Sequence, residues 1–478
     1  MKDVGKWKKN SMKIDILVAE IGSTTTVVNA FHNIHTDTPE FVGQGQAATT
    51  VEEGDVRIGL ENSIQDLQRN LKADTLTYDE LFATSSAAGG LKMTVHGLVF
   101  DMTARAAKEA ALGAGAIVKM VTAGNMRRTD IKKIQEENPN IILIAGGVDY
   151  GERETALNNA EKLAELNLPI PVIYAGNIEN DEEVKLIFEN YDNDLYVVEN
   201  VFPKIDELNV EPTRKVIQDT FEKHIVHAPG MEHVYDIVNG TITPTPAAVM
   251  NLSKLIHDRI GDVLVIDVGG ATTDVHSVTE GTEAIAKIQV APEPIAKRTV
   301  EGDLGLYVNK ENVIDLIGEE ELEKQGFDLE TFRKEYHSIP KNDQERKLVE
   351  ILSEAATLTA VERHAGQIRY VYGPTGRSTL AQGKDLSNVK FVIGTGGALT
   401  RLPNGPDILK KIPKDKKSKS PILLPTGTVK VLIDHDYIMA SLGVLAFKYE
   451  DAALKLLEQS FGENVFEQAA KERESEEV

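Results

Sequence analysis

The feature that most constrains the fold is an internal repeat, in which residues 16–28 align without gaps with residues 263–275. The first copy reads ILVAEIGSTTTVV and the second reads VLVIDVGGATTDV. Each has an apolar run, an acidic residue, a glycine-containing turn and a second β-branched run, which is typical of two strands joined by a tight turn. Either hairpin alone would be ordinary in an α/β protein. Their duplication favours a chain built from two related halves.

Length and composition indicate a large globular protein. The 478 residues exceed one ordinary core and predict about two to four folding units. A net charge of −23 repels phosphate polymers and anionic membranes, so we expect neither nucleic acid nor membrane among the partners. The absence of cysteine excludes disulfides and cysteine-based metal sites. With no signal-like segment and no apolar run of the ~20 residues that span a bilayer, we expect a cytoplasmic location.

The region between the repeats alternates short apolar runs with amphipathic segments. We expect strands at 116–121, 141–145, 172–175 and 195–198 and helices at 128–137, 153–166 and 181–190. Such alternation is typical of a small parallel sheet with crossover helices. The predicted first lobe therefore spans 14–250 and contains an inserted α/β subdomain at about 86–225.

The rest of the chain is assigned by pattern. A second lobe is expected at 251–450, with a Glu-, Lys- and Leu-rich helical block at about 310–368. Residues 1–13 are predicted to be a flexible N-terminus, and 451–478 a C-terminal helix with a charged tail. The sequence does not decide whether the protein forms a homo-oligomer, because symmetric interfaces leave no mark in a single sequence.

The turns of both repeats carry residue types that hold phosphate oxygens. Glycine permits a tight turn with exposed N–H groups, and hydroxyl side chains add donors. The predicted phosphate-binding residues are Gly22, Ser23, Thr24 and Thr25 in the first turn and Gly269, Gly270, Thr272 and Thr273 in the second. Two such turns facing each other would hold a polyphosphate and its metal.

Acidic residues stand beside both turns. Asp267 leads the second turn and supplies a hard oxygen ligand suited to Mg²⁺, directly or through water. Glu20 stands at the equivalent place in the first repeat, and we expect it to assist Asp267 as a metal ligand. Asp274 follows the second turn and is predicted either to orient water or to support the metal site without touching the metal. These three carboxylates are the predicted catalytic residues.

A third glycine cluster lies in the segment FVIGTGGAL, where we expect a strand to run into a turn and the start of a helix. We expect Gly394, Gly396, Gly397 and Ala398 to approach a ligand closely through their backbone. A turn that only packs a helix is the alternative. The segment is not a dinucleotide fingerprint, because Leu399 occupies the third glycine position, and the chain has no Walker A sequence.

Three other segments have both a functional and a structural interpretation. Glu301-Gly302-Asp303 is a candidate to face a ribose or base, or an ordinary acidic loop. Arg363-His364 belongs either to the interlobe cleft or to surface packing. Asp149 follows two glycines at a predicted strand end, where parallel sheets form ligand crevices.

The order of these parts resembles the actin-like ATPase superfamily, which includes actin, Hsp70 and sugar kinases. Glu20–Thr26 is similar to its phosphate 1 motif, Asp267–Asp274 to phosphate 2 and Gly394–Leu399 to the adenosine motif. Thr245–Met250 is similar to the superfamily's connect 1 motif, and Tyr437–Leu445 is similar to its connect 2 motif. The resemblance implies an α/β fold with duplicated ribonuclease-H-like lobes that close on ATP or ADP with Mg²⁺.

Within that superfamily the chain resembles the glutamate-mutase-associated accessory family, GlmL or MutL, which is unrelated to the mismatch-repair protein of that name. The resemblance rests on AEIGSTTTVVNAF, TSSAAGGLKM, IDVGGATTDVHSV, TVEGDLG and IGTGGALTRL. It implies an ATP-driven chaperone that reactivates an adenosylcobalamin-dependent mutase by exchanging damaged cobalamin.

The chain departs from the superfamily at two residues, and the second departure predicts slow hydrolysis. Glu20 stands where phosphate 1 usually has Asp, and Thr243 stands where chaperone-type members have a Glu that places the attacking water. Slow hydrolysis fits a nucleotide-timed switch. A small-molecule kinase is the alternative and would need a general base such as Asp101 or Asp149. A nucleotide-gated polymer is a third possibility.

Overall fold

The computed structural model describes residues 10–22, 25–50, 54–86, 91–225, 234, 237–239, 242–337, 340–373, 376–415 and 420–469. Two predicted phosphate-binding residues, Ser23 and Thr24, lie outside the described residues. So do residues 1–9 of the expected flexible N-terminus and residues 470–478 of the expected tail.

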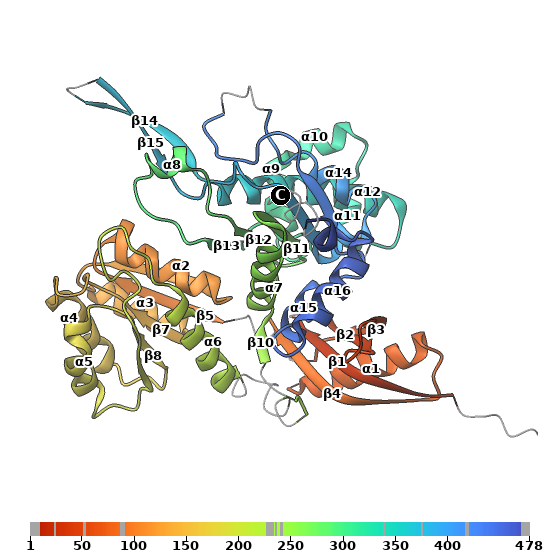
Figure 1. The fold of residues 1–478 in the computed structure, drawn as a ribbon, viewed down its shortest axis with the longest axis horizontal. Helices are drawn as coiled ribbons and strands as arrows, with labels where there is room; N and C mark the ends of the chain where they lie inside the picture. Colours follow the sequence, from red (N-terminus) through yellow and green to blue (C-terminus); the bar gives the residue numbers. More distant parts are fainter. Residues whose placement is uncertain are drawn as a thin grey trace, which may run out of the picture.

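The first repeat forms the centre of a five-stranded sheet (Figure 1). Its strands are β1 (Ser11–Ile21), β2 (Thr25–His32), β3 (Glu40–Ala48), β4 (Thr75–Ser85) and β10 (Ile242–Pro244), in the order β10-β4-β1-β2-β3. β1 is antiparallel to β2 and parallel to β4, and helix α1 (Val56–Asn70) packs on β3. β1 already begins at Ser11, so residues 11–13 belong to the sheet rather than to the expected flexible N-terminus.

The second repeat forms the centre of a sheet with the same design. Its strands are β11 (Val263–Val268), β12 (Thr273–Val278), β13 (Ala296–Glu301), β16 (Phe391–Thr395) and β17 (Lys430–Ile433), in the order β13-β12-β11-β16-β17. β11 is antiparallel to β12 and parallel to β16, as β1 is to β2 and β4. The shared strand order and directions confirm the predicted duplication of a ribonuclease-H-like unit.

Two helices fill the space between the sheets (Figure 1). These are α7 (Thr245–Ile260) and α15 (Met439–Leu445), which cross closely where a Cβ on Gly443 would overlap the carbonyl of Ala248. Strand residues alternate between faces, and the equivalent residues Val18 and Val265 both enter the core around these helices. α15 packs with β1 and β4, and the following α16 (Glu450–Phe461) packs against α15 and β17, so the chain returns to the first sheet before residue 450.

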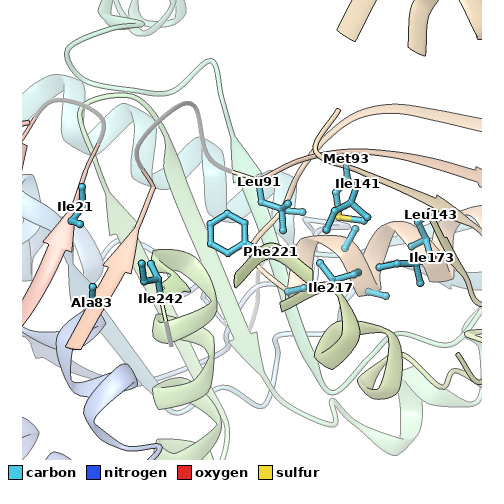
Figure 2. Packing of buried hydrophobic residues seen from close by; sticks show 14 of the residues in the cluster. Ile21, Ala83, Leu91, Met93, Ile141, Leu143, Ile173, Ile217, Phe221 and Ile242 are labelled. Atoms are coloured by element: carbon cyan, nitrogen blue, oxygen red, sulfur yellow. The ribbon is translucent and has the colours of Figure 1, made fainter. Parts of the chain in front are cut away.

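A parallel sheet is inserted between β4 and β10. Its strands are β5 (Lys92–Gly97), β6 (Ile117–Ala123), β7 (Ile141–Ile144), β8 (Val172–Tyr174) and β9 (Leu195–Val197), in the order β6-β5-β7-β8-β9. Its helical segments are η2 (Phe100–Ala104), α2 (Arg105–Gly113), α3 (Arg128–Glu137), α4 (Glu154–Ala164), η3 (Ile178–Asn180), α5 (Asp181–Phe188) and α6 (Glu211–Ile225). Figure 2 shows its core continuing into the first sheet, from Met93 and Phe221 toward Ile21 and Ile242.

The second lobe carries the expected helical block, formed by α9 (Lys310–Ile317), α10 (Glu319–Lys324), α11 (Leu329–Glu335) and α12 (Asp343–His364). Shorter helices are α8 (Glu283–Ala286), α13 (Gly396–Arg401) and α14 (Gly405–Leu409). The block ends at His364, earlier than expected, because an unpredicted hairpin of β14 (Gln367–Gly373) and β15 (Gly376–Gln382) follows it. Among the described helices, none is both long enough and apolar enough to cross a bilayer.

Candidate functional site

The two repeated turns close with the same backbone hydrogen bond. Gly22 N donates to Thr25 O at 3.0 Å, and Gly269 N donates to Thr272 O at 2.9 Å. A Cβ on Gly22 would lie 2.7 Å from Thr25 O, which is closer than real Cβ atoms approach. Glycine is therefore required at the tightest point of the first turn, and the duplication extends to turn geometry.

Glu20 and Asp267 stand at equivalent ends of β1 and β11, and each is partly exposed. Removal from water, followed by the negative charges of Asp274, Glu20 and Asp434, raises the pKa of Asp267 to about 8. Burial, with the charge of Asp434, raises the pKa of Glu20 to about 7. Because Glu20 from one lobe perturbs Asp267 from the other, the two carboxylates lie within electrostatic reach where the lobes meet. Such crowded negative charge favours a cation.

Tyr437 and Asp434 belong to this cluster and were missed by the sequence prediction of the site. The Tyr437 hydroxyl donates to Glu20 Oε1 at 3.3 Å, joining the end of the second lobe to the first turn. Asp434 is fully buried and accepts from Thr395 Oγ1 at 3.0 Å and from Met439 N at 2.8 Å. It thereby ties the end of β16 to the start of α15. An acidic residue ahead of an apolar helix was the available signal.

Asp274 is a fully engaged carboxylate. Its Oδ1 accepts from Arg298 Nε at 2.7 Å and also from Arg298 Nη2, and its Oδ2 accepts from Thr272 Oγ1 at 2.9 Å. Arg298 is 2% exposed and also donates to Leu112 O at 3.2 Å and Ala116 O at 3.0 Å. Asp274 therefore positions the second turn and, through Arg298, connects it to the inserted subdomain. Nothing in the sequence pattern pointed to Arg298.

The third glycine cluster meets the second turn at one residue. Gly396 has a φ of +82°, and a Cβ there would overlap Asp267 Oδ1 and lie 2.6 Å from Val268 N. Gly397 is exposed with open space around it, and Ala398 is partly exposed. Gly394 is instead buried in β16, where a Cβ would lie 2.8 Å from a methyl group of Leu409. Gly394 is thus a packing position, and Gly396 makes its close approach to Asp267 and Val268 within the protein, so the approach of this cluster to a ligand stays a prediction.

We expect Gly396→Ala to destabilise the protein by about 1–3 kcal/mol, because the added methyl group overlaps Asp267 in a left-handed backbone conformation. Gly397→Ala is the matched control, since nothing lies near its Cβ position. Urea denaturation of both variants checks the difference. Equal stability of the two would contradict the contact between Gly396 and Asp267.

Other predicted site residues have mixed placements. The Thr273 hydroxyl donates to Leu304 O at 2.8 Å in a buried position, so this contact gives no support to a phosphate-binding role for that hydroxyl. Thr25 begins β2 and is partly exposed, and Gly270 is exposed beside Tyr307.

The three segments with two interpretations make contacts within the protein. Arg363 donates to Glu301 at 2.8 Å and to Asp303 at 2.8 Å, so the acidic turn and the arginine hold each other. His364 is buried between the hydroxyls of Thr299 and Ser277, both at 2.8 Å, and burial lowers its pKa. Asp149 accepts from Ile178 N and from Asn200 Nδ2 within the inserted subdomain. These contacts match the structural interpretations of Arg363 and His364.

The carboxylate cluster offers oxygen atoms as donors to a cation. In the described part of the chain, no group of three or more His, Cys, Asp or Glu side chains is arranged to hold a metal ion. Glu20 and Asp267 offer oxygen ligands from two sides. Mg²⁺ is commonly held by one or two carboxylates together with water and substrate phosphates.

Two ribonuclease-H-like lobes of identical strand order, with matching carboxylate-bearing turns where they meet, define the actin-like ATPase fold class. The chain belongs to the MutL protein family, whose pattern it matches over residues 16–461. It is 37% identical over 459 residues to Protein MutL of Clostridium tetanomorphum, which covers 93% of this chain and 98% of that protein.

Two solved structures resemble the chain distantly. A nucleotide-free structure of acetone carboxylase aligns with 91% of this chain and 70% of its own, at 12% identity and a TM-score of 0.40. The ethanolamine utilization protein EutJ from Carboxydothermus hydrogenoformans aligns with 90% of this chain and 89% of its own, at 12% identity and a TM-score of 0.26. The fold class therefore rests on strand order and direction.

Proposed function

We propose that this protein binds Mg-ATP between its lobes, hydrolyses it slowly and uses the cycle to reactivate an adenosylcobalamin-dependent mutase, of the glutamate mutase or aminomutase type, by exchanging damaged cobalamin. The observation that carries nucleotide binding is the pair of matching turns, each led by a carboxylate, in which Glu20 accepts from Tyr437 of the second lobe and Asp267 lies against Gly396. Membership of the MutL protein family supports the role toward a mutase.

The residues divide the work between metal, phosphates and nucleoside. Mg²⁺, when bound, would neutralise the phosphates and polarise the bond to be cleaved. Asp267 and Glu20 would hold it, and the two turns would face the phosphates, while the N–H groups of Gly22 and Gly269 are used to close those turns. Gly397 and Ala398 offer accessible backbone on the adenosine side.

Slow hydrolysis follows from the position of Thr243. It lies in β10 beside Thr84 of β4 and is 7% exposed, and its hydroxyl is a poor general base compared with a carboxylate. A protein that cleaves ATP slowly retains each nucleotide state long enough to act on a partner. A cytoplasmic site of action is part of the proposal.

The kinase alternative has weaker support. A kinase needs a general base beside the acceptor hydroxyl and close to the transferred phosphate. Asp149 is committed to hydrogen bonds with loops of the inserted sheet, and Asp101 lies exposed in η2 of the same subdomain. Neither is among the charges that perturb Asp267.

Binding is tested by thermal denaturation with Mg-ATP. A ligand present at ~1,000 times its dissociation constant stabilises the folded form by about 4 kcal/mol. We expect a clear rise of the melting temperature with Mg-ATP and a smaller rise when EDTA replaces the metal. If the melting temperature stayed unchanged with Mg-ATP, that result would contradict nucleotide binding between the lobes.

Reactivation is tested with a mutase inactivated by loss or damage of its cobalamin. We expect turnover to recover when this protein, ATP and fresh adenosylcobalamin are all present. The matched control omits ATP, and a second control uses the Asp267→Asn variant. Recovery that is equal without ATP would count against the proposed mechanism.

A further inference from the structure

A two-stranded hairpin stands apart from the sheets of the molecule. β14 and β15 pair only with each other as named strands, from Gln367 opposite Gln382 to Gly373 opposite Gly376. Figure 1 shows the hairpin projecting from the second lobe beyond the neighbouring helices. Isolated two-stranded ribbons are marginally stable because they lack a core to pack against. Such a projection points to a role outside the fold.

The outer half of the hairpin exposes an aromatic and cationic face. Tyr372 lies opposite Arg377, and Tyr370, two residues earlier on β14, shares that face. The Arg377 guanidinium lies 4.6 Å from the centre of the Tyr370 ring. Tyr370 is 55% exposed and Tyr372 is 78% exposed. On the opposite face Arg369 is exposed and Val371 is 48% exposed.

The charge of the hairpin is opposite to that of the chain as a whole. Residues 366–383 include two arginines and no carboxylate, whereas the whole chain has a net charge of −23. Tyr and Arg are enriched among the side chains that dominate binding energy in protein interfaces. The complementary surface would present carboxylates around apolar side chains.

The base of the hairpin is fixed to the second lobe. Ala381 N donates to Ile288 O at 2.8 Å, and Val290 N donates to Ala381 O at 2.8 Å. Just beyond β15, the buried ammonium group of Lys384 donates to the carbonyls of Thr279 and Ile295. On β14, Ile368 N donates to Pro421 O at 2.8 Å. Because the base is held on both strands, the exposed face is presented in a defined orientation, which lowers the entropy cost of binding.

We propose that β14 and β15 form the docking element for a partner protein whose surface presents carboxylates around apolar side chains. The proposal rests on the proposed function, in which that partner is the mutase. Nucleic acid also favours arginine and tyrosine, but the net charge of −23 repels it at long range. Two hairpins of separate copies would oppose like-charged arginine faces, which disfavours self-association through this element.

The test measures the dissociation constant of the mutase holoenzyme for the full-length protein. One variant carries Tyr370→Ser and Tyr372→Ser, and another carries Arg369→Glu and Arg377→Glu. We expect each to weaken binding about thirtyfold or more, as loss of dominant interface residues does. The melting temperature and the rate of ATP hydrolysis without mutase should stay at wild-type values, because these side chains are exposed and outside the carboxylate cluster.

The matched control carries Tyr78→Ser and Arg128→Glu, which alter an exposed tyrosine on β4 and an exposed arginine on α3. It should bind the mutase within about twofold of wild type. Wild-type binding by the hairpin variants would overturn the docking proposal and leave the proposed function intact. Absence of mutase binding by the wild-type protein would instead overturn both.

Two further measurements test whether the hairpin binds a second copy of this chain or nucleic acid instead of the mutase. Sedimentation of the protein alone should show the same oligomeric state for wild type and hairpin variants, and a hairpin-dependent dimer would overturn the proposal in favour of a second copy. A fluorescent single-stranded oligonucleotide should not bind at physiological salt. Binding that the Arg369→Glu and Arg377→Glu variant abolishes would overturn it in favour of nucleic acid.

Discussion

Replacing Arg298 with methionine is expected to lower the free energy of unfolding by about 3–5 kcal/mol, because it leaves a buried carboxylate without its partner. Arg298 bonds Asp274 beside the second turn and the carbonyls of Leu112 and Ala116 in the inserted subdomain. The same substitution therefore loosens both the turn and its connection to the insertion. Urea denaturation followed by circular dichroism measures the change.

The environment of Arg298 makes compensation by water difficult. Its neighbour Lys297 is also buried and bonds Glu293 at 2.7 Å, and Arg105 of the inserted subdomain bonds Glu293 at 2.9 Å. Arg214 donates to Ala296 O at 2.8 Å. The inserted subdomain is thus held against β13 by several buried charged contacts, and Arg298 is the one that continues to the candidate site.

A surface ion pair provides the control for Arg298. Arg333 pairs with Glu311 at 2.8 Å and with Glu319, but its side chain is 35% exposed. Arg333→Met should lower stability by less than about 1 kcal/mol. Adding Asp274→Asn to Arg298→Met should recover part of the lost stability, because the uncompensated charge is removed. A loss for Arg298→Met no larger than for Arg333→Met would contradict the buried link.

Replacing Asp267 with asparagine is expected to weaken Mg-ATP binding and to reduce hydrolysis by about 10²–10³-fold, the range typical for loss of one group that stabilises a transition state. The side chain keeps its size and loses its charge, so the effect reports on metal binding rather than packing. Calorimetric titration with Mg-ATP and a phosphate-release assay measure the two changes. Asp258→Asn, on the exposed end of α7, is a carboxylate control.

The same residue predicts a pH dependence of binding. Mg²⁺ binds the ionised carboxylate, and the pKa of Asp267 lies at about 8 in the folded protein. Below that pH, binding has to displace a proton, so affinity should fall by about tenfold or more from pH 8.5 to pH 6.5. Asp267→Asn should remove this part of the dependence. Proton release is read from calorimetry in buffers of different ionisation enthalpy, and equal release by the variant would contradict the assignment.

Stability should respond to pH in the opposite sense. Raised pKa values mean that folded Asp267 and Glu20 bind more protons than the unfolded chain between about pH 4 and pH 8. The stability that protonation contributes is complete below pH 4 and is lost as pH rises through 7 and 8. The nucleotide-free wild-type protein should therefore melt at a lower temperature at pH 8.5 than at pH 6.5. Asp267→Asn should show a smaller decrease.

The repeat predicted the architecture well because it encodes local and duplicated information. Alternating apolar residues specify the faces of β1 and β11, and the glycines at Gly22 and Gly269 specify the turns between paired strands. Four strands of the inserted sheet followed from periodicity, and α3 has the predicted bounds of Arg128–Glu137, but β5, which lies between β6 and β7, was not predicted. The β14–β15 hairpin was missed, since its polar and exposed strands lack the alternation that a half-buried strand shows.

By itself, the sequence determined the two-lobed α/β architecture, the two turns and the carboxylates that lead them, because these depend on residue patterns within short segments. Only the tertiary structure decided which of the predicted site side chains form hydrogen bonds within the protein. Asp274 is held by Arg298, the Thr273 hydroxyl by Leu304, and Glu20 meets Tyr437 from the far end of the chain. Such contacts join residues far apart in sequence, and their geometry depends on how complete sheets and helices pack.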